Sequence, residues 1–221
     1  MTGKRVVLRD GSQVLIRQVQ RGDAALLADG FARLSAESRR LRFLTAKPEL
    51  SAAELRYYTE VDHHDHEALG ALDHFDGRGL GTARYLRYAE DPAAAEIAVT
   101  VIDDWQRRGL GTELLTQLTD RARQEGIGRF TALVAADNVA VAGLLQNLGT
   151  GVRVTGRGYG TVDYEITLPR RGLGGELHAL LRAFARRQLK LPNSIRNVLT
   201  GLIPDRFTPG RGASCRSANG A

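Results

Sequence analysis

The chain of 221 residues can hold one full domain plus a tail, and its 43% hydrophobic and 25% charged content is ordinary for a globular protein. No stretch approaches the roughly 20 apolar residues of a membrane-spanning helix, and the first residues lack the apolar run of a signal peptide. We therefore expect a cytoplasmic protein. The single cysteine, Cys215, leaves no internal disulfide and no cysteine-based metal cluster.

The net charge of +6 is concentrated in the C-terminal part of the chain. Residues 170–221 carry 10 Lys and Arg against 2 Asp and Glu, whereas residues 1–169 carry 21 against 23. A domain that reads DNA or RNA carries positive charge on its own folded face, so we expect no specific nucleic-acid partner. The spacing of apolar and basic residues after position 170 predicts a basic amphipathic helix and then a disordered tail, which could contact a membrane or an acidic partner.

The sequence of the N-terminal third predicts a hairpin followed by helices. The dipeptide Asp10-Gly11 suits a tight turn between strands at 6–9 and 14–19, and we treat residues 1–12 as an arm. Asp23 stands where a helix cap belongs, and helices are predicted from there to about residue 34 and over 37–44. Ser51 and Glu54 form a capping-box pattern at the start of a third helix over 51–60.

The remainder of the chain predicts strands, then a helix, then strands and a second helix. An antiparallel meander is expected over 67–73, 82–88 and 96–102. An amphipathic helix follows from about residue 110 to 126. The later elements are a strand at 130–135, a helix at 138–148 and two strands at 151–155 and 161–168.

The most informative segment is the glycine loop between the third meander strand and the amphipathic helix. Gly109 and Gly111 let a ligand approach the backbone at the helix N-terminus, where unpaired N–H groups and the helix dipole attract a phosphate. A simple tight turn is the alternative interpretation. The third glycine of a dinucleotide-binding loop is replaced by Leu114, and the Lys-Ser/Thr of a Walker loop is absent.

The segment Gln106–Gly111 resembles the Gln/Arg-x-x-Gly-x-Gly/Ala motif of the GNAT acetyltransferases, and the order of elements over 13–169 is also similar to theirs. The resemblance implies a mixed, mostly antiparallel sheet flanked by helices, with acetyl-CoA as co-substrate. It implies that the backbone of Val99, Thr100 and Val101 binds pantetheine and that Asn138 helps to hold the cofactor arm. It assigns the pyrophosphate to Arg107, Arg108, Gly109, Leu110, Gly111 and Thr112.

Glu96 is the candidate general base. It stands in an otherwise apolar strand, so we expect its carboxyl to be desolvated. Desolvation raises the pKa of a carboxyl towards the working pH of a base. A base is needed because an amine acceptor arrives largely as ammonium, with a reference pKa of roughly 10.4 for lysine. The alternative is a solvated glutamate at a strand edge, or an ion pair with a neighbour such as Arg84.

A narrower resemblance concerns the acceptor. The segments around Leu15–Arg17, Leu34–Ser38, Leu41–Phe43 and Asp104–Gln106 are similar to the acetyltransferase domain of bacterial Pat-type protein lysine acetyltransferases. The resemblance implies acetylation of a protein lysine, for example in an acyl-CoA synthetase, with a glutamate at the Glu96 position. A small-molecule amine is the alternative acceptor.

Two features limit this interpretation. The tyrosine that many family members use as an acid for the departing thiolate is replaced by Leu145, which leaves open a non-catalytic acyl-CoA sensor with a partner-binding tail. Tyr159 and Tyr164 are weak substitutes. The cluster of His63, His64 and His66 lacks a second ligand group, so we assign no metal and expect a polar loop at the rim of the acceptor site.

Overall fold

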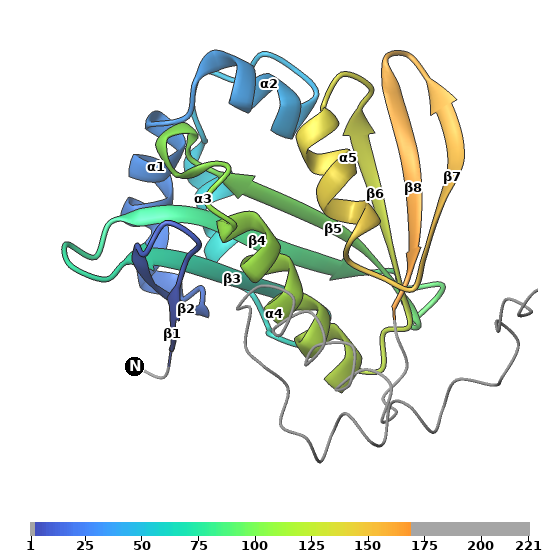
Figure 1. Ribbon diagram of the computed structural model, residues 1–221, viewed down its shortest axis with the longest axis horizontal. Helices are drawn as coiled ribbons and strands as arrows, with labels where there is room; N and C mark the ends of the chain where they lie inside the picture. Colours follow the sequence, from blue (N-terminus) through green and yellow to red (C-terminus); the bar gives the residue numbers. More distant parts are fainter. Residues whose placement is uncertain (1–2, 169–221) are drawn as a thin grey trace, which may run out of the picture. The chain divides into compact units, whose positions relative to one another are not determined.

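The computed structural model describes residues 3–168, which form one eight-stranded sheet with helices on both faces (Figure 1). The strands are β1 (Lys4–Val7), β2 (Gln13–Gln18), β3 (His66–Asp73), β4 (Gly79–Arg87), β5 (Ala94–Val101), β6 (Arg129–Ala135), β7 (Gly151–Gly158) and β8 (Thr161–Thr167). The described α-helices are α1 (Ala24–Ala32), α2 (Ala36–Phe43), α3 (Ala52–Thr59), α4 (Leu110–Gln124) and α5 (Val139–Gln146). The helix and tail predicted after residue 170 lie outside the described residues.

The predicted hairpin and meander are confirmed, because β1 to β5 follow one another in the sheet and every neighbouring pair is antiparallel. Gly11 adopts a φ of +85° in the first turn, as the Asp10-Gly11 dipeptide predicts. The N-terminal segment that we expected to be an arm contributes β1, the edge strand of the same sheet. No helix within residues 3–168 is both long and apolar enough to cross a bilayer.

Of two helix starts that the sequence predicts, one is confirmed and the other is wrong. At α3 the capping box forms, since the Ser51 hydroxyl accepts the Glu54 N–H at 3.3 Å and the Glu54 carboxylate accepts the Ser51 N–H at 2.9 Å. At α1 the expected cap is wrong, because Asp23 makes no side-chain cap bond. Its carboxylate instead accepts hydrogen bonds from Arg17 and from the Gln20 N–H.

The sheet separates two layers of helices. Helix α4 crosses one face of the central strands, and α1 and α3 lie behind the opposite face (Figure 1). The predicted apolar stripe of α4 is buried in the core, and it consists of Leu110, Leu114, Leu115 and Leu118. The face toward α4 is mainly apolar, with Ala83 and Tyr85 fully buried, whereas the face toward α1–α3 carries the polar side chains Arg17, Thr82 and Arg84.

The sheet opens at its centre, between β5 and β6. These two strands run parallel and pair only from Ala94 to Glu96 on β5, and beyond Glu96 they diverge. On the far side of the opening β8 pairs with β6, and β7 takes the outer edge. A strand edge without a partner exposes backbone donors and acceptors. The fold therefore places free peptide groups of β5 inside an opening in the sheet.

Candidate functional site

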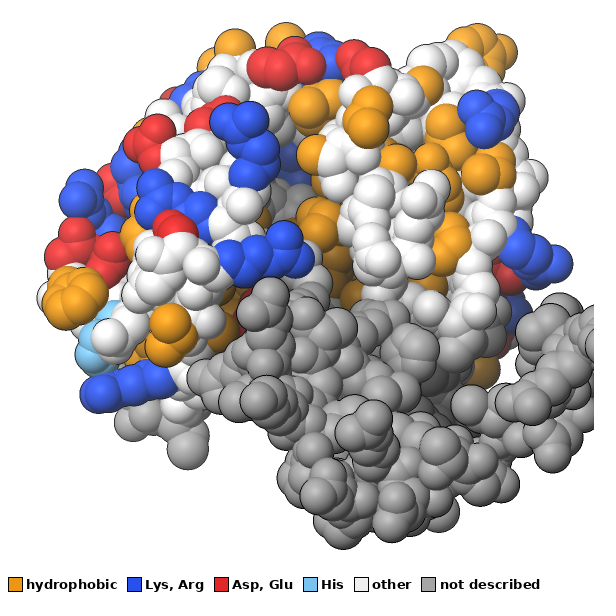
Figure 2. Space-filling model, viewed as in Figure 1, with side chains coloured by type: hydrophobic (Ala, Val, Ile, Leu, Met, Phe, Trp, Pro, Cys, Tyr) orange, Lys and Arg blue, Asp and Glu red, His pale blue; other side chains and the backbone are white. Residues whose placement is uncertain are grey.

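A cleft of about 660 Å³ occupies the opening between β5 and β6. Its walls come from β5 and β6, from the loop before α4 and from one side of α2 and α5. The space-filling view shows hydrophobic side chains gathered over α5 and the neighbouring strands, and basic and acidic side chains intermixed toward α2 and β1 (Figure 2). The sequence-predicted residues that line the cleft are Glu96, Val99, Thr100, Val101, Arg107, Gly109, Gly111, Thr112 and Asn138.

The backbone of β5 presents alternate peptide groups to the cleft. Ile102 donates its N–H to the Leu80 carbonyl of β4 at 3.0 Å. Because strand peptide groups alternate between the two edges, the groups of Val99 and Val101 point away from β4, toward the cleft. The Val101 carbonyl already accepts the Gln106 side-chain amide at 3.1 Å. The peptide groups of Thr100 face β4 by the same alternation, so this residue can contribute only its side chain, which differs from the backbone role expected for it.

The glycine loop leaves the first turn of α4 uncapped. Gly109 is the N-cap with a φ of +94° and makes no side-chain cap bond, so the first N–H groups of α4 have no side-chain acceptor from it. Arg107 has a φ of +60°, a conformation that is uncommon for residues with a side chain. A Cβ at Gly111 would lie 3.2 Å from Leu144 of α5, so the two helices approach closely here. The uncapped turn fits an anionic group, as the sequence predicts.

The two remaining loop residues face elsewhere. The Leu110 side chain is buried in the core, so only its backbone can serve the cleft. Arg108 donates to Asp10 at 3.1 Å and stacks over the Trp105 ring at 4.8 Å, and it does not line the cleft. The structure therefore pairs the charge of Arg108 with the first hairpin, and the resemblance-based assignment of this residue to the pyrophosphate stays a prediction.

Asn138 is buried at the N-terminus of α5, and its side-chain oxygen accepts the Val141 N–H at 3.1 Å. Within residues 3–168 its amide nitrogen has no hydrogen-bond partner. The residue thus caps the helix with one atom and keeps a donor for the cleft that it lines.

Glu96 lies where β5 and β6 begin to diverge, and its side chain is exposed. The expectation of a desolvated glutamate is wrong for this structure, because the apolar neighbours in sequence point to the other face or into the open cleft. The alternative ion pair with Arg84 is also absent among the described residues. The carboxylate is instead open to the cleft, on the face that carries α2.

Several other candidates lie away from the cleft. Tyr159 is fully exposed at the β7–β8 turn, Tyr164 packs against the core, and no tyrosine is among the described residues that line the cleft. The histidine loop does not line it either. His63 and His64 pair with Glu67 and Glu125, which ties the loop to α4 and contradicts the expected position at the acceptor rim.

The contribution of α2 was not assigned from the sequence. Ser38 and Arg42 line the cleft from this helix, opposite β5. Asp103, just after β5, holds the helix by accepting the Ser35 and Ser38 hydroxyls at 2.7 and 2.8 Å. The sequence carries no local signal for this placement, because it depends on the packing of a helix on a distant strand.

Comparison with known proteins agrees with the geometry. The model of the acetyltransferase (GNAT) family matches residues 33–150. The acetyltransferase Pat of Mycolicibacterium smegmatis is 33% identical over 144 residues, which is 65% of this chain and 43% of that protein. The acetyltransferase PA5475 of Pseudomonas aeruginosa is 36% identical over 144 residues, 64% of this chain and 77% of that protein.

A solved structure is similar over most of the described part. The crystal structure of the GNAT domain of S. lividans PAT superimposes with a TM-score of 0.69 at 32% identity, and the match covers 75% of this chain and 97% of that one. This chain spans less than half of the length of the M. smegmatis protein that it matches.

Proposed function

The chain belongs to the acetyltransferase (GNAT) family and is an acetyl-CoA-dependent N-acetyltransferase, and we propose that its acceptor is a lysine side chain of a protein and that Glu96 is the general base. The observation that carries the proposal is the position of Glu96. Its carboxylate is exposed in the cleft at the point where the strands part, within reach of an amine that enters from solvent. The lysine acceptor rests on the resemblance to Pat-type acetyltransferases.

The cleft offers groups of the right kind for each part of acetyl-CoA. The open peptide groups of Val99 and the N–H of Val101 suit the amides of pantetheine, and the Asn138 amide adds a donor beside them. The uncapped turn at Gly109–Thr112 and the side chain of Arg107 suit the pyrophosphate. Acetyl-CoA supplies the acetyl group as a thioester.

Glu96 takes the proton that the entering ammonium must lose, directly or through a water molecule. The freed nitrogen then forms a bond to the acetyl carbon while the bond from that carbon to sulfur breaks. The Val99 N–H, which points into the cleft, would donate to the carbonyl oxygen as negative charge develops on it. After the attack the nitrogen loses its second proton to water. The departing thiolate takes up a proton from water, because no tyrosine lines the described cleft.

The experiment follows free thiol release from acetyl-CoA with two kinds of acceptor, a lysine-containing acyl-CoA synthetase and a panel of small amines. Replacing Glu96 by Gln should lower kcat by about 10²–10⁴-fold while leaving the affinity for acetyl-CoA nearly unchanged. Glu90→Gln is the matched control, since Glu90 is exposed before β5 and lines no cleft. Full activity of Glu96→Gln would remove the proposed base.

Two other functions remain as outcomes of the same assay. A small amine is the alternative acceptor, and thiol release with a small amine alone would move the acceptor to this class. A sensor is favoured by Leu145 at the position of the usual tyrosine. Binding of acetyl-CoA without thiol release to any acceptor would support the sensor. We also propose a cytoplasmic location, which cell fractionation tests.

A further inference from the structure

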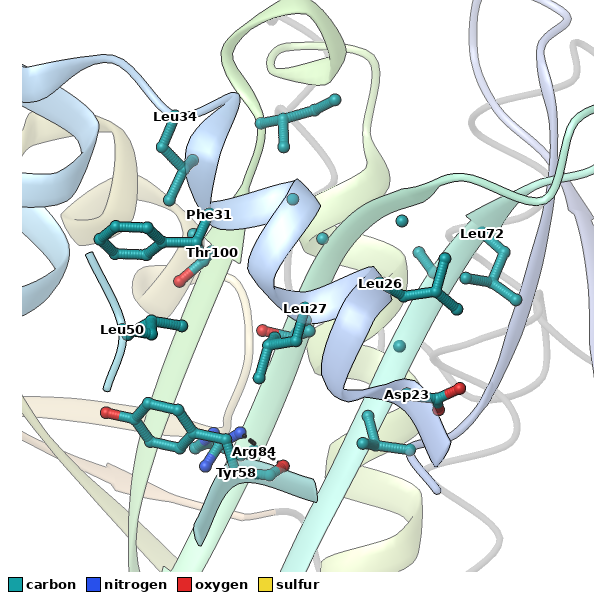
Figure 3. A pocket seen from close by; sticks show the side chains of 18 of the residues that line it. Asp23, Leu26, Leu27, Phe31, Leu34, Leu50, Tyr58, Leu72, Arg84 and Thr100 are labelled. Carbon is teal, nitrogen blue, oxygen red and sulfur yellow. Dashed lines mark hydrogen bonds between the residues drawn. The ribbon is translucent and has the colours of Figure 1, made fainter. Parts of the chain in front are cut away.

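A second pocket, here called the α1 pocket, lies between α1 and the sheet face that α1–α3 cover (Figure 3). Leu27 of α1 faces it from one side, and Arg84 of β4 lies beside Tyr58 of α3 at one end. Its cavity volume is about 90 Å³. The apolar part of the wall includes Leu26, Leu27, Phe31, Leu34, Leu50 and Leu72.

Arg84 places a charge in this apolar pocket without a carboxylate to balance it. The residue is 9% exposed, and its guanidinium donates to the Tyr58 carbonyl at 3.2 Å and contacts His66 Nε2 at 3.3 Å. It also stacks over the Tyr58 ring at 4.1 Å. Burial, together with the charge of Arg42, lowers the pKa of Arg84 to about 10. Among residues 3–168 it forms no ion pair.

Arg42 brings a second guanidinium to the same pocket. It extends from α2, lies over the Phe43 ring at 5.0 Å and lines both the α1 pocket and the cleft. Within the described part of the chain it has neither a hydrogen bond nor an ion pair. Burial lowers the pKa of Arg42 as well, with Tyr58 and Glu96 acting in the opposite direction.

A third arginine in the pocket shows how the fold neutralises a buried charge that belongs to its structure. Arg17 is buried, and Asp23 accepts two hydrogen bonds from its guanidinium, at 2.6 and 2.8 Å. Arg84 is buried in the same wall and Arg42 is half-buried there, and neither has such a partner. A buried charge without a counter-ion is costly, so an anion that enters this pocket gains both guanidinium groups as partners.

We propose that the α1 pocket binds a small organic carboxylate with an apolar body, and that Arg42 and Arg84 hold its carboxylate. Planar guanidinium groups form paired hydrogen bonds with a carboxylate, and the leucines accommodate an aliphatic body. At 10–15 Å³ for each water-sized site, the cavity has room for about six to nine non-hydrogen atoms. This size fits a short branched-chain acid.

The α1 pocket adjoins the acetyl-transfer cleft, because Arg42, Phe43 and Thr100 line both. The carboxylate of an occupant would therefore lie on the α2 side of the cleft, and would neutralise positive charge close to the path of an entering ammonium. The proposal goes beyond acetyl transfer and does not depend on the proposed acceptor, since binding can be measured without acetyl-CoA.

The test uses 3-methylbutanoate and its amide, 3-methylbutanamide, which share one shape and differ in charge. Thermal unfolding of the full chain is followed with increasing concentrations of each compound. The carboxylate should raise the unfolding temperature by about 3–6 °C at ten times its Kd, and the amide should leave it unchanged. Equal stabilisation by the two compounds, or by neither, would overturn the proposal.

Variants then locate the site. Arg42→Gln should abolish the carboxylate-dependent shift, whereas Arg56→Gln, which changes an exposed arginine on α3 outside the pocket, should retain it. Arg84→Gln should also abolish it, but Arg84 is buried and its loss affects folding, so Arg42→Gln decides the question. A shift that survives Arg42→Gln would place the carboxylate elsewhere and would refute the assignment.

Discussion

The Arg121 guanidinium of α4 donates a hydrogen bond of 3.0 Å to the carboxylate of Glu67 on β3, whose side chain is fully buried. Gln18 donates to the same carboxylate from β2 at 2.9 Å, and His63 and the Ala68 N–H contact its other oxygen at 2.7 and 3.0 Å. Every lone-pair direction of this buried charge is thus occupied. The Arg121–Glu67 ion pair attaches α4 to the sheet, and the first turn of the same helix lines the cleft.

Arg121→Met should lower the free energy of unfolding by about 3 kcal/mol, because it removes the only positive guanidinium that contacts Glu67 among the described residues. Urea unfolding at neutral pH measures the change. The control is Arg153→Met, which removes an exposed ion pair with Glu165 and should cost less than about 1 kcal/mol. Equal losses in the two variants would show that the buried pair contributes no more than a surface one.

His66 should make stability depend on pH. It is 8% exposed, and burial, with the neighbouring charge of Arg84, lowers the pKa of His66 to about 4 from an ordinary value of 6.5. Between these values the unfolded chain binds a proton that the folded chain does not, so stability falls by about 3 kcal/mol as the pH drops from 6.5 to 4. His66→Gln should remove this part of the slope in urea unfolding, and His74→Gln, in the β3–β4 turn, should not.

Asp23→Asn should destabilise the fold by about 3 kcal/mol, because it leaves the buried Arg17 guanidinium without its carboxylate. Burial works to raise the pKa of Asp23, but hydrogen bonds from Arg17 and Gln20 lower it overall. The contribution is therefore complete above the ordinary value of 3.8 and is lost as the pH falls below it. Wild type and variant should converge in acid. Asp29→Asn, which changes an exposed pair with Arg33, is the control at neutral pH.

Elements with strong local signals could be predicted from the sequence. The α4 stripe has apolar residues at helical spacing, and the Ser51–Glu54 box specifies its own hydrogen bonds, so both appear as expected. The glycine loop predicts an accessible helix N-terminus, and Gly109 leaves the first turn of α4 without a side-chain cap. These features depend on a few neighbouring residues.

Features set by long-range packing could not be predicted. Glu96 has apolar neighbours in sequence but is exposed, because β6 leaves β5 at this residue. Glu67 was assigned to a strand without any indication that it is buried, since its partners come from three separate segments. Arg108 lies in the loop motif, and its pairing with Asp10 of the first hairpin turned it away from the cleft.

The two ends of α4 offer a matched test of the phosphate seat, because Gly109 and Gly126 both have a positive φ, +94° and +81°. Replacing either by Ala places a Cβ in the left-handed region, which should cost about 1 kcal/mol of stability in both cases. Only Gly109→Ala should also weaken acetyl-CoA binding, by about tenfold or more, since only this glycine lines the cleft. Calorimetric titration measures the affinity, and urea unfolding measures the stability.

If both variants bind acetyl-CoA as the wild type does, the first turn of α4 is not the seat of the pyrophosphate. If both lose affinity equally, the cause is the general loss of stability and not the geometry of the loop.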